Sequence, residues 1–318
     1  MGSKRRSRSA APPLPCNPGC SSLLLTIQPH ESLRSFIERH FYLVPRSPES
    51  IKLKEISRYY MRGQSIGVIA DLLGRSDTYE FNRLLHEHTS YSQVGVFPDS
   101  DQRSYTRGNY QDSYKRFETE CQLAGICIDC VKEDIESLGF AYWRRDHRYV
   151  EVCAKHNTIL LRKCPVCKRD IRYHSRGYGH DLLWSGCKGR YVHQCESEIN
   201  SNQEKLIFAR IFAEIGESTY AVDLESAIAQ LAGKATKMVM EGLITEEQLI
   251  AINWKLESSR GISDTSLDYR PDGMYSRNMI EVIAGLYGSF AALIDSLRGA
   301  DKIQNVSDLM RVEYRKRW

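Results

Sequence analysis

The stretch of sequence that decides the fold begins at Cys127-Ile-Asp-Cys130 and continues through Cys153-Ala-Lys-His156 and Cys164-Pro-Val-Cys167. In such a stretch, two ligand residues with two residues between them can bend into a knuckle whose donor atoms point at one centre. Two knuckles then complete a tetrahedron around Zn²⁺. The first four candidates therefore predict a closed Cys₃His site made of Cys127, Cys130, Cys153 and His156.

A second site is predicted downstream from Cys164, Cys167, Cys187 and Cys195. The identity of its fourth ligand is undecided, because His193 can take the place of Cys195. Each site has four protein ligands and leaves no position for water or substrate, as in structural rather than catalytic zinc centres. We therefore expect two structural Zn²⁺ ions, which stabilise a segment that is short of large aliphatic side chains.

Two chemical alternatives for these residues are weaker. A thioredoxin-like redox pair suits Cys164-Pro-Val-Cys167 alone, but not beside a matching set of Cys/His pairs. Cys153 and His156 are close enough in sequence to form a nucleophile pair, yet no third orienting residue accompanies them. We therefore expect no enzymatic activity. Of the other cysteines, Cys16 and Cys20 are interpreted as free thiols, and Cys121 as a small buried hydrophobic residue.

The composition agrees with a soluble zinc protein. The 318 residues are 42% hydrophobic and 26% charged, enough for a core and two or three modules. No apolar run is long enough to cross a bilayer and no secretory signal is visible, so we expect a bacterial cytoplasmic location without a membrane. Ten cysteines in that compartment favour metal over disulfides.

Charge is unevenly distributed along the chain. Net charge is +4, the first residues are basic, residues 141–192 carry an excess of cations, and residues 201–300 an excess of anions. The cationic parts can meet a phosphate backbone, or be ordinary solvated surface. The same two interpretations, phosphate contact or solvated surface, apply to Arg144, Arg145 and Arg148. Next to them, Trp143 is expected to pack over the zinc knuckles.

Helical periodicity flanks the Cys/His stretch on its N-terminal side. Leu33, Phe36 and Ile37 share one face of a short helix. Residues 65–73 form a second helix that Gly74 stops, and a further helix follows at once. This is the outline of a helix-turn-helix, which many helical hairpins that never touch DNA also have.

The C-terminal part is predicted to be helical as well. Thr245 and Gln248 resemble a capping box that opens one helix. A final helix pair, joined at Gly288, has the outline of a second helix-turn-helix or of an interaction bundle.

The expected fold is therefore mainly α with small zinc-ribbon or knuckle elements. We divide it into a disordered basic tail (1–22), an N-terminal helix-turn-helix domain (23–118), a twin zinc-finger module (119–198) and a C-terminal helical, helix-turn-helix-like domain (199–318).

Two motifs resemble the TniQ/TnsD family of transposition proteins. One is the Cys/His run with Glu133-Asp134, Tyr142-Trp143-x-x-x-His147 and Leu160-Leu161 between its ligands. The other is Pro29-His-Glu31-Ser32-x-x-Ser35-x-x-x-Arg39. Together they span residues 29–167. The chain departs from the family in its basic leader and in Cys187 and Cys195, which lie eight apart where members usually carry a tight Cys pair.

The resemblance implies a function that the residues alone do not give. TniQ proteins are target-selection adaptors without chemistry of their own, which recruit the AAA+ regulator TnsC. In CRISPR-associated transposons the adaptor rides as a homodimer on an RNA-guided Cascade complex, held by its crRNA-end and backbone subunits. We expect this role, with target DNA bound weakly or only indirectly. The alternative is a TnsD-like protein that reads a fixed attachment site through residues 76–88.

Overall fold

The computed structural model describes residues 24–53, 56, 60–75, 77–98, 116–119, 125–174, 181–260, 274–298 and 303–311. In these ranges the fold is mainly helical, with two small antiparallel sheets of two strands each, which confirms the expected class. The predicted tail (1–22) lies outside the described residues, as do Cys16, Cys20 and Cys121.

The N-terminal part consists of α1 (Leu33–Leu43), α2 (Pro48–Leu53), α3 (Gly63–Leu72), α4 (Thr78–His88) and α5 (Ser92–Gly95), with β1 (Tyr60–Arg62) paired to β2 (Arg116–Thr119). The predicted helix pair is α3 and α4. Gly74 between them has φ +68°, a left-handed conformation that favours glycine. Asp77 then caps α4 by accepting a hydrogen bond from the Glu80 amide.

The Cys/His region has little regular structure. It contains α6 (Ile128–Leu138), the four-residue helix α7 (Leu182–Ser185), and the single 3₁₀ turns η2 (Asp146–Arg148), η3 (Ile171–Tyr173) and η4 (Val192–Gln194). Isolated β-bridges such as Ile126 to Leu161 connect the loops. Trp143 is buried in a hydrophobic cluster that includes Cys164 and Cys187, so it packs against the second set of knuckles as expected.

The C-terminal part contains α8 (Gln203–Glu217), α9 (Leu224–Met240), α10 (Glu246–Arg260), α11 (Met274–Leu286) and α12 (Phe290–Leu297). It continues with β4 (Ile303–Asn305), which pairs with β3 (Tyr220–Val222), and with α13 (Val306–Arg311). The predicted capping box is present, because Gln248 N–H donates to Thr245 Oγ1 and Thr245 N–H to Gln248 Oε1. The final helix pair turns at Gly288 as predicted.

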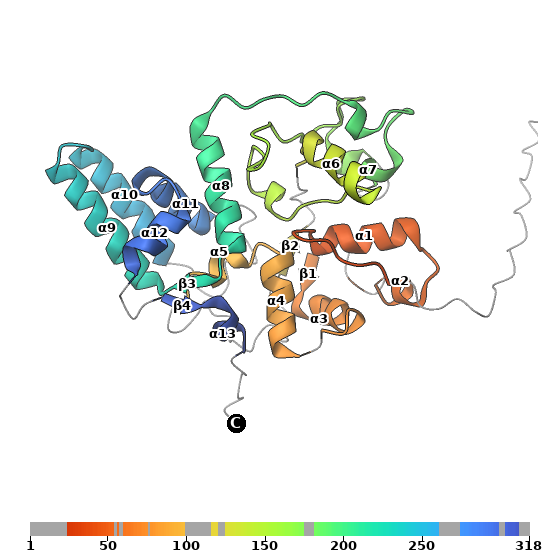
Figure 1. The fold of residues 1–318 in the computed structure, drawn as a ribbon, viewed down its shortest axis with the longest axis horizontal. Helices are drawn as coiled ribbons and strands as arrows, with labels where there is room; N and C mark the ends of the chain where they lie inside the picture. The colour runs from red at the N-terminus through yellow and green to blue at the C-terminus, as the bar shows by residue number, and fades with distance from the viewer. Residues whose placement is uncertain are drawn as a thin grey trace, which may run out of the picture.

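The N-terminal and C-terminal helices share a hydrophobic core. One cluster of buried side chains contains residues from both ends of the chain, from Ile27 to Met310. The segment α13 returns to α4, where Asn82 Nδ2 donates to the Met310 carbonyl at 3.0 Å, and Figure 1 shows α13 beside α4. Between the two groups stands α8, which contacts α4 and α5 as well as α11 and α12.

Within the described ranges no helix by itself has the length and apolar character needed to cross a membrane. A bent pair, Arg277–Leu286 with Phe290–Leu297 at 76°, meets those criteria only when the two helices are taken together.

Candidate metal centres

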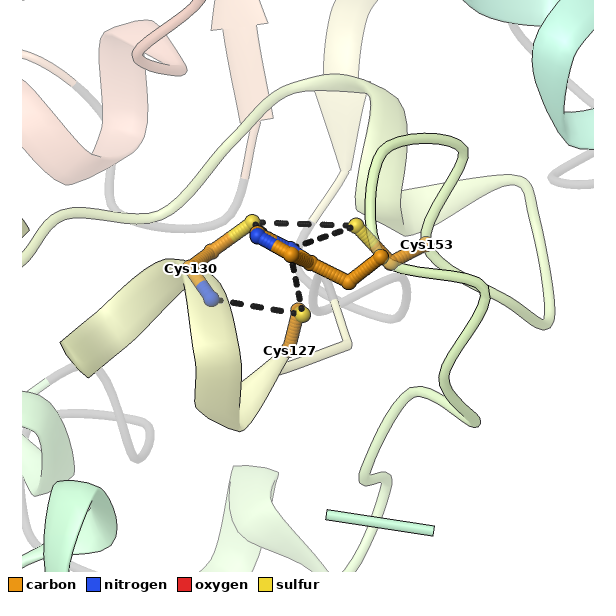
Figure 2. Close-up of side chains that lie close together, drawn as sticks. Cys127, Cys130 and Cys153 are labelled. Atoms are coloured by element: carbon orange, nitrogen blue, oxygen red, sulfur yellow. Dashed lines mark hydrogen bonds between the residues drawn. The ribbon is translucent and has the colours of Figure 1, made fainter. Parts of the chain in front are cut away.

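The first predicted ligand set, Cys127, Cys130, Cys153 and His156, converges on one point. The donor atoms all lie within 4.8 Å of one another. Cys130 Sγ is 3.6 Å from Cys153 Sγ and 3.3 Å from His156 Nδ1, and Figure 2 shows the three sulfurs facing each other. A tetrahedral Zn²⁺ with ordinary bond lengths has ligand–ligand edges of about 3.5–3.8 Å. These four residues therefore have nearly the spacing that zinc requires.

Local backbone structure supplies this geometry. Cys127 is the N-cap of α6, and its sulfur accepts a hydrogen bond from Cys130 N–H at 3.4 Å. The partial positive charge of the helix N-terminus favours the thiolate forms of both residues. The second knuckle closes at Asn157, whose left-handed φ of 53° turns the chain and whose N–H donates to the Cys153 carbonyl.

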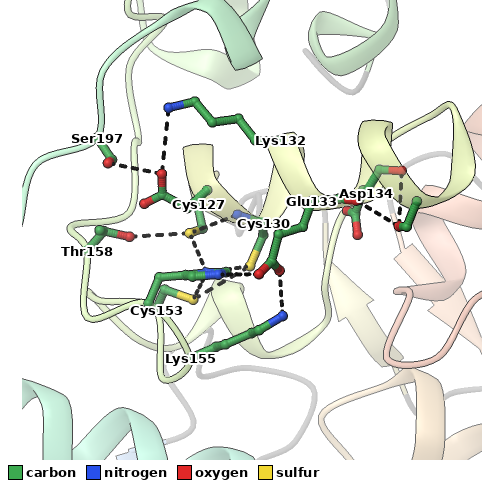
Figure 3. Close-up of polar contacts among 12 residues, drawn as sticks. Cys127, Cys130, Lys132, Glu133, Asp134, Cys153, Lys155, Thr158 and Ser197 are labelled. Carbon is green, nitrogen blue, oxygen red and sulfur yellow. Dashed lines mark hydrogen bonds and ion pairs between the residues drawn. The ribbon is translucent and has the colours of Figure 1, made fainter.

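A second layer of polar contacts orients these ligands (Figure 3). Glu133, one helical turn after Cys130, lies 3.0 Å from His156 Nε2, so that Nδ1 faces the sulfurs. A carboxylate on the outer nitrogen fixes the tautomer and ring orientation of a metal-ligating histidine. Thr158 Oγ1 lies 3.3 Å from Cys127 Sγ. The sequence signal for Glu133 was its place between Cys130 and Cys153 in the motif that resembles the TniQ/TnsD family.

The thiols influence one another's ionisation. Hydrogen bonds from Cys130 and then Cys153 lower the pKa of the Cys127 thiol. In return, the hydrogen bond with Cys127 raises the pKa of Cys130. The same partner raises the pKa of Cys153 to about 11. Three buried sulfurs cannot all carry a negative charge without a cation among them. The donor set thus fits a divalent metal ion, which would hold all three as thiolates.

The second cluster differs from its prediction in one member. Its donor atoms, which lie within 4.8 Å of one another, belong to Cys164, Cys167, His174 and Cys187. Two tight turns build it: Lys168 (φ 63°) N–H donates to the Cys164 carbonyl, and Cys187 and Arg190 exchange two backbone hydrogen bonds. His174 Nδ1 is buried and has no hydrogen-bond partner in the described part of the chain, as a nitrogen reserved for a metal would be.

Neither Cys195 nor His193, the two residues predicted to close this site, belongs to the cluster. Cys195 Sγ lies 3.7 Å from the Tyr191 carbonyl, and the His193 ring stacks on Tyr191 with centroids 5.6 Å apart. Cys195 and His193 were considered because they come after Cys187 in the chain, although Cys195 lies eight positions from it. His174 was missed because six residues separate it from Cys167, which is not a tight pair.

Two arginines after Trp143 were expected to contact phosphate or solvent, and both are engaged within the protein. Arg144 forms two 2.8 Å hydrogen bonds with the Asp134 carboxylate. Arg145 is only 3% exposed, which makes both expectations wrong for it. Its guanidinium donates to the carbonyls of His86, at the end of α4, and of Gly216, at the end of α8. Arg145 therefore connects three parts of the chain.

A buried polar cluster joins the N-terminal segment to the Cys/His region. Glu31, with no exposed surface, accepts hydrogen bonds from Arg39 at 2.7 and 3.0 Å and from Ser35 Oγ at 2.9 Å. Ser35 Oγ in turn accepts from Trp143 N–H, and Ser32 N–H donates to the Trp143 carbonyl. Loss of one partner of this buried ion pair would leave an uncompensated buried charge, which is strongly destabilising.

Comparison with known proteins adds no assignment. No model of a protein family matches this chain, and no relative was found among curated proteins.

Proposed function

We propose that this chain is a non-enzymatic, TniQ-type adaptor for transposition target selection, which connects an RNA-guided Cascade complex to the AAA+ regulator TnsC. Its two metal centres hold zinc as structural ions. The proposal rests first on the residue resemblance between positions 29 and 167.

The observation that carries the proposal is that the two resembling motifs bind each other. Glu31, Ser32 and Ser35 of the first motif contact Trp143 and its neighbours in the second, through the Ser35–Trp143 hydrogen bond and the bridge between Glu31 and Arg144. Residues 108 positions apart are thus parts of one buried cluster. If the two motifs resembled the family only by chance, there would be no reason to expect them to contact each other in the fold.

The metal centres favour an adaptor over an enzyme. Each cluster offers four protein donors to one ion, so neither leaves the open coordination position that a hydrolytic zinc needs for water or substrate. The buried surroundings of Cys130 and Cys153 also make them poor nucleophiles.

The exposed face of α4 gives little support to the TnsD-like alternative. A recognition helix presents donors and cations to base edges and phosphates. On α4, Arg83 is paired with Glu80 and Glu87 at 3.2 and 2.7 Å, while Asn82 is buried and donates to the Met310 carbonyl. The one arginine of this helix is therefore outnumbered by glutamates, which favours weak DNA binding near the non-specific range.

Co-purification tests the proposal. The tagged chain is co-expressed with the Cascade subunits and guide RNA of a type I CRISPR-associated transposon, and the eluate is analysed for size, RNA and zinc. We expect a stoichiometric particle with one short RNA species. A chain that elutes alone and retains an attachment-site duplex would instead support the TnsD-like function.

A matched pair of variants shows whether the zinc fold is needed for association. Cys187→Ala removes a member of the second cluster, whereas Cys195→Ala removes a thiol outside it. We expect Cys195→Ala to co-purify as the wild type does and Cys187→Ala to lose zinc and association together. Equal behaviour of the two would contradict the structural role of this centre.

A further inference from the structure

We propose that the tips of the second Cys/His cluster bind single-stranded nucleic acid through phosphate contacts and base stacking. The knuckle surface, as we call it, consists of Lys168, Arg169, Lys188, Arg190 and Tyr191. The proposal is independent of the adaptor function.

The metal cluster itself brings these cations together. Lys168 directly follows the ligand Cys167, and the Arg169 carbonyl accepts a hydrogen bond from Cys164 N–H at 2.8 Å. On the other turn, Lys188 follows Cys187, and the Arg190 carbonyl accepts from Cys187 N–H at 2.8 Å. Since the ligand atoms lie within 4.8 Å of one another, the two turn tips are held side by side.

The four cations are available for a partner. All are exposed, and none forms a salt bridge with a carboxylate of the described residues. This contrasts with α4 and α10, where Arg83, Lys255 and Arg260 are paired with glutamates. Asp170 is an exposed carboxylate close by in sequence. The surface therefore carries four cations without a salt bridge among the described residues against one nearby carboxylate, an excess of positive charge of the kind that phosphate-binding surfaces have.

Aromatic side chains next to the cations favour unpaired bases. Tyr191 adjoins Arg190 and is 41% exposed; His193 stacks on its ring at an interplanar angle of 18°, which fixes its orientation. Tyr173, which directly precedes the donor His174, is 63% exposed. Exposed rings beside cations are the usual platform for stacking bases without sequence preference.

Duplex DNA fits this surface less well. Reading a major groove requires a helix or a two-stranded ribbon long enough to enter it. Here the cations lie on tight turns, and the neighbouring elements are α7 with four residues and η3 and η4 with three each. The left-handed residues Lys168 (φ 63°) and Lys188 (φ 49°) make each tip compact, suited to a flexible strand rather than a groove.

Fluorescence anisotropy with the zinc-loaded full chain tests this. The probes are labelled oligo-dT and oligo-U of about 20 nucleotides, and a duplex of the same length, over about 50–200 mM salt. We expect the single strands to bind more tightly than the duplex. The oligonucleotide that binds more tightly, oligo-dT or oligo-U, shows whether the surface prefers DNA or RNA. Polyglutamate serves as a competitor that carries negative charge without bases. If polyglutamate at the same concentration of negative charges displaces the strand, the surface attracts any polyanion and the proposal is overturned.

Variants locate the site. Lys168→Gln, Arg169→Gln, Lys188→Gln and Arg190→Gln together should weaken binding at least about tenfold. They should also make the slope of log affinity against log salt shallower by up to about 2.8, from about 0.7 for each lost phosphate contact. The control removes four cations of the C-terminal part, Arg210, Lys234, Lys237 and Arg298, by the same substitution; Lys237 and Arg298 are paired with Glu241 and Asp295. Equal loss in the control would overturn the proposal.

Two further variants keep the test decisive. Tyr191→Leu removes the ring without charge, and should weaken binding at least about fivefold at an unchanged salt slope. If the fourfold variant loses zinc, the pair Lys188→Gln and Arg190→Gln is measured in its place, with an expected change in slope of about 1.4. Unchanged affinity in a zinc-loaded variant would contradict the proposal.

Discussion

The composition of the second metal centre can be tested by comparing two substitutions. His174→Ala removes a donor that lies within 4.8 Å of three cysteine sulfurs. Cys195→Ala removes a half-buried sulfur whose polar contact is a 3.7 Å approach to the Tyr191 carbonyl. The structure therefore predicts very different consequences for Cys195, which the sequence analysis named as a ligand, and for His174, which it did not consider.

The magnitudes follow from what each side chain does. Loss of a residue that hydrogen-bonds a metal ligand typically weakens metal binding by about 10–100-fold, so loss of the donor His174 itself should cost more than about 100-fold, or about 2.7 kcal/mol. Cys195 offers only a weak sulfur hydrogen bond and partial packing, and its loss should cost about 1 kcal/mol or less of unfolding free energy. Zinc affinity should not change in Cys195→Ala.

The assay is competition for zinc with a chromophoric chelator, followed for both variants beside the wild type. We expect two tightly held zinc ions in the wild type and in Cys195→Ala, and one in His174→Ala. The opposite result, in which Cys195→Ala loses one ion and His174→Ala keeps both, would refute the geometric argument and restore Cys195 as the ligand.

Three other predictions rest on single contacts. Glu133→Gln weakens the carboxylate contact of His156 and should lower zinc affinity of the first site by about 10–100-fold, whereas the exposed Glu136→Gln should have no effect in the same competition assay. Gly216→Ala places a methyl group against the Arg145 guanidinium and should cost about 1–3 kcal/mol in denaturant unfolding; Gly233→Ala, in open space on α9, should instead stabilise by about 0.5–1 kcal/mol. Burial lowers the pKa of four histidines well below the ordinary 6.5, to about 4 for His40 and about 3 for His86, His88 and His147. These histidines stay neutral in the folded protein while those of the unfolded chain take up protons as the pH falls below 6.5. The free energy of unfolding present above pH 6.5 should therefore be lost progressively between pH 6.5 and about 4. The loss is up to about 1.4 kcal/mol per pH unit for each histidine. Urea unfolding at several pH values measures this, and a flat profile between pH 6.5 and 5 would contradict it.

The sequence predicted what depends on local spacing. Cys127 and Cys130 share one helical turn, and Cys153 and His156 share one knuckle, so the geometry of the first site follows from short-range backbone structure. The capping box at Thr245 was predictable for the same reason.

What the sequence could not predict depends on distant parts of the chain. Arg145 is a basic residue in a cationic stretch, and only the carbonyls of His86 and Gly216 show why it is buried. His174 enters the second centre through the turn at η3 rather than through a tight pair. The return of α13 to α4 depends on an Asn82 contact across 228 positions.

The central claim, that this chain physically connects Cascade to TnsC, is tested most directly by a bridging measurement. Cascade with its guide RNA is bound to immobilised target DNA, and TnsC with ATP is added with or without the zinc-loaded chain. The account predicts that TnsC is retained on the DNA only when the chain is present, and that omission of the guide RNA abolishes retention. Equal retention of TnsC without the chain, or retention by the chain on an attachment-site duplex without Cascade, would contradict it.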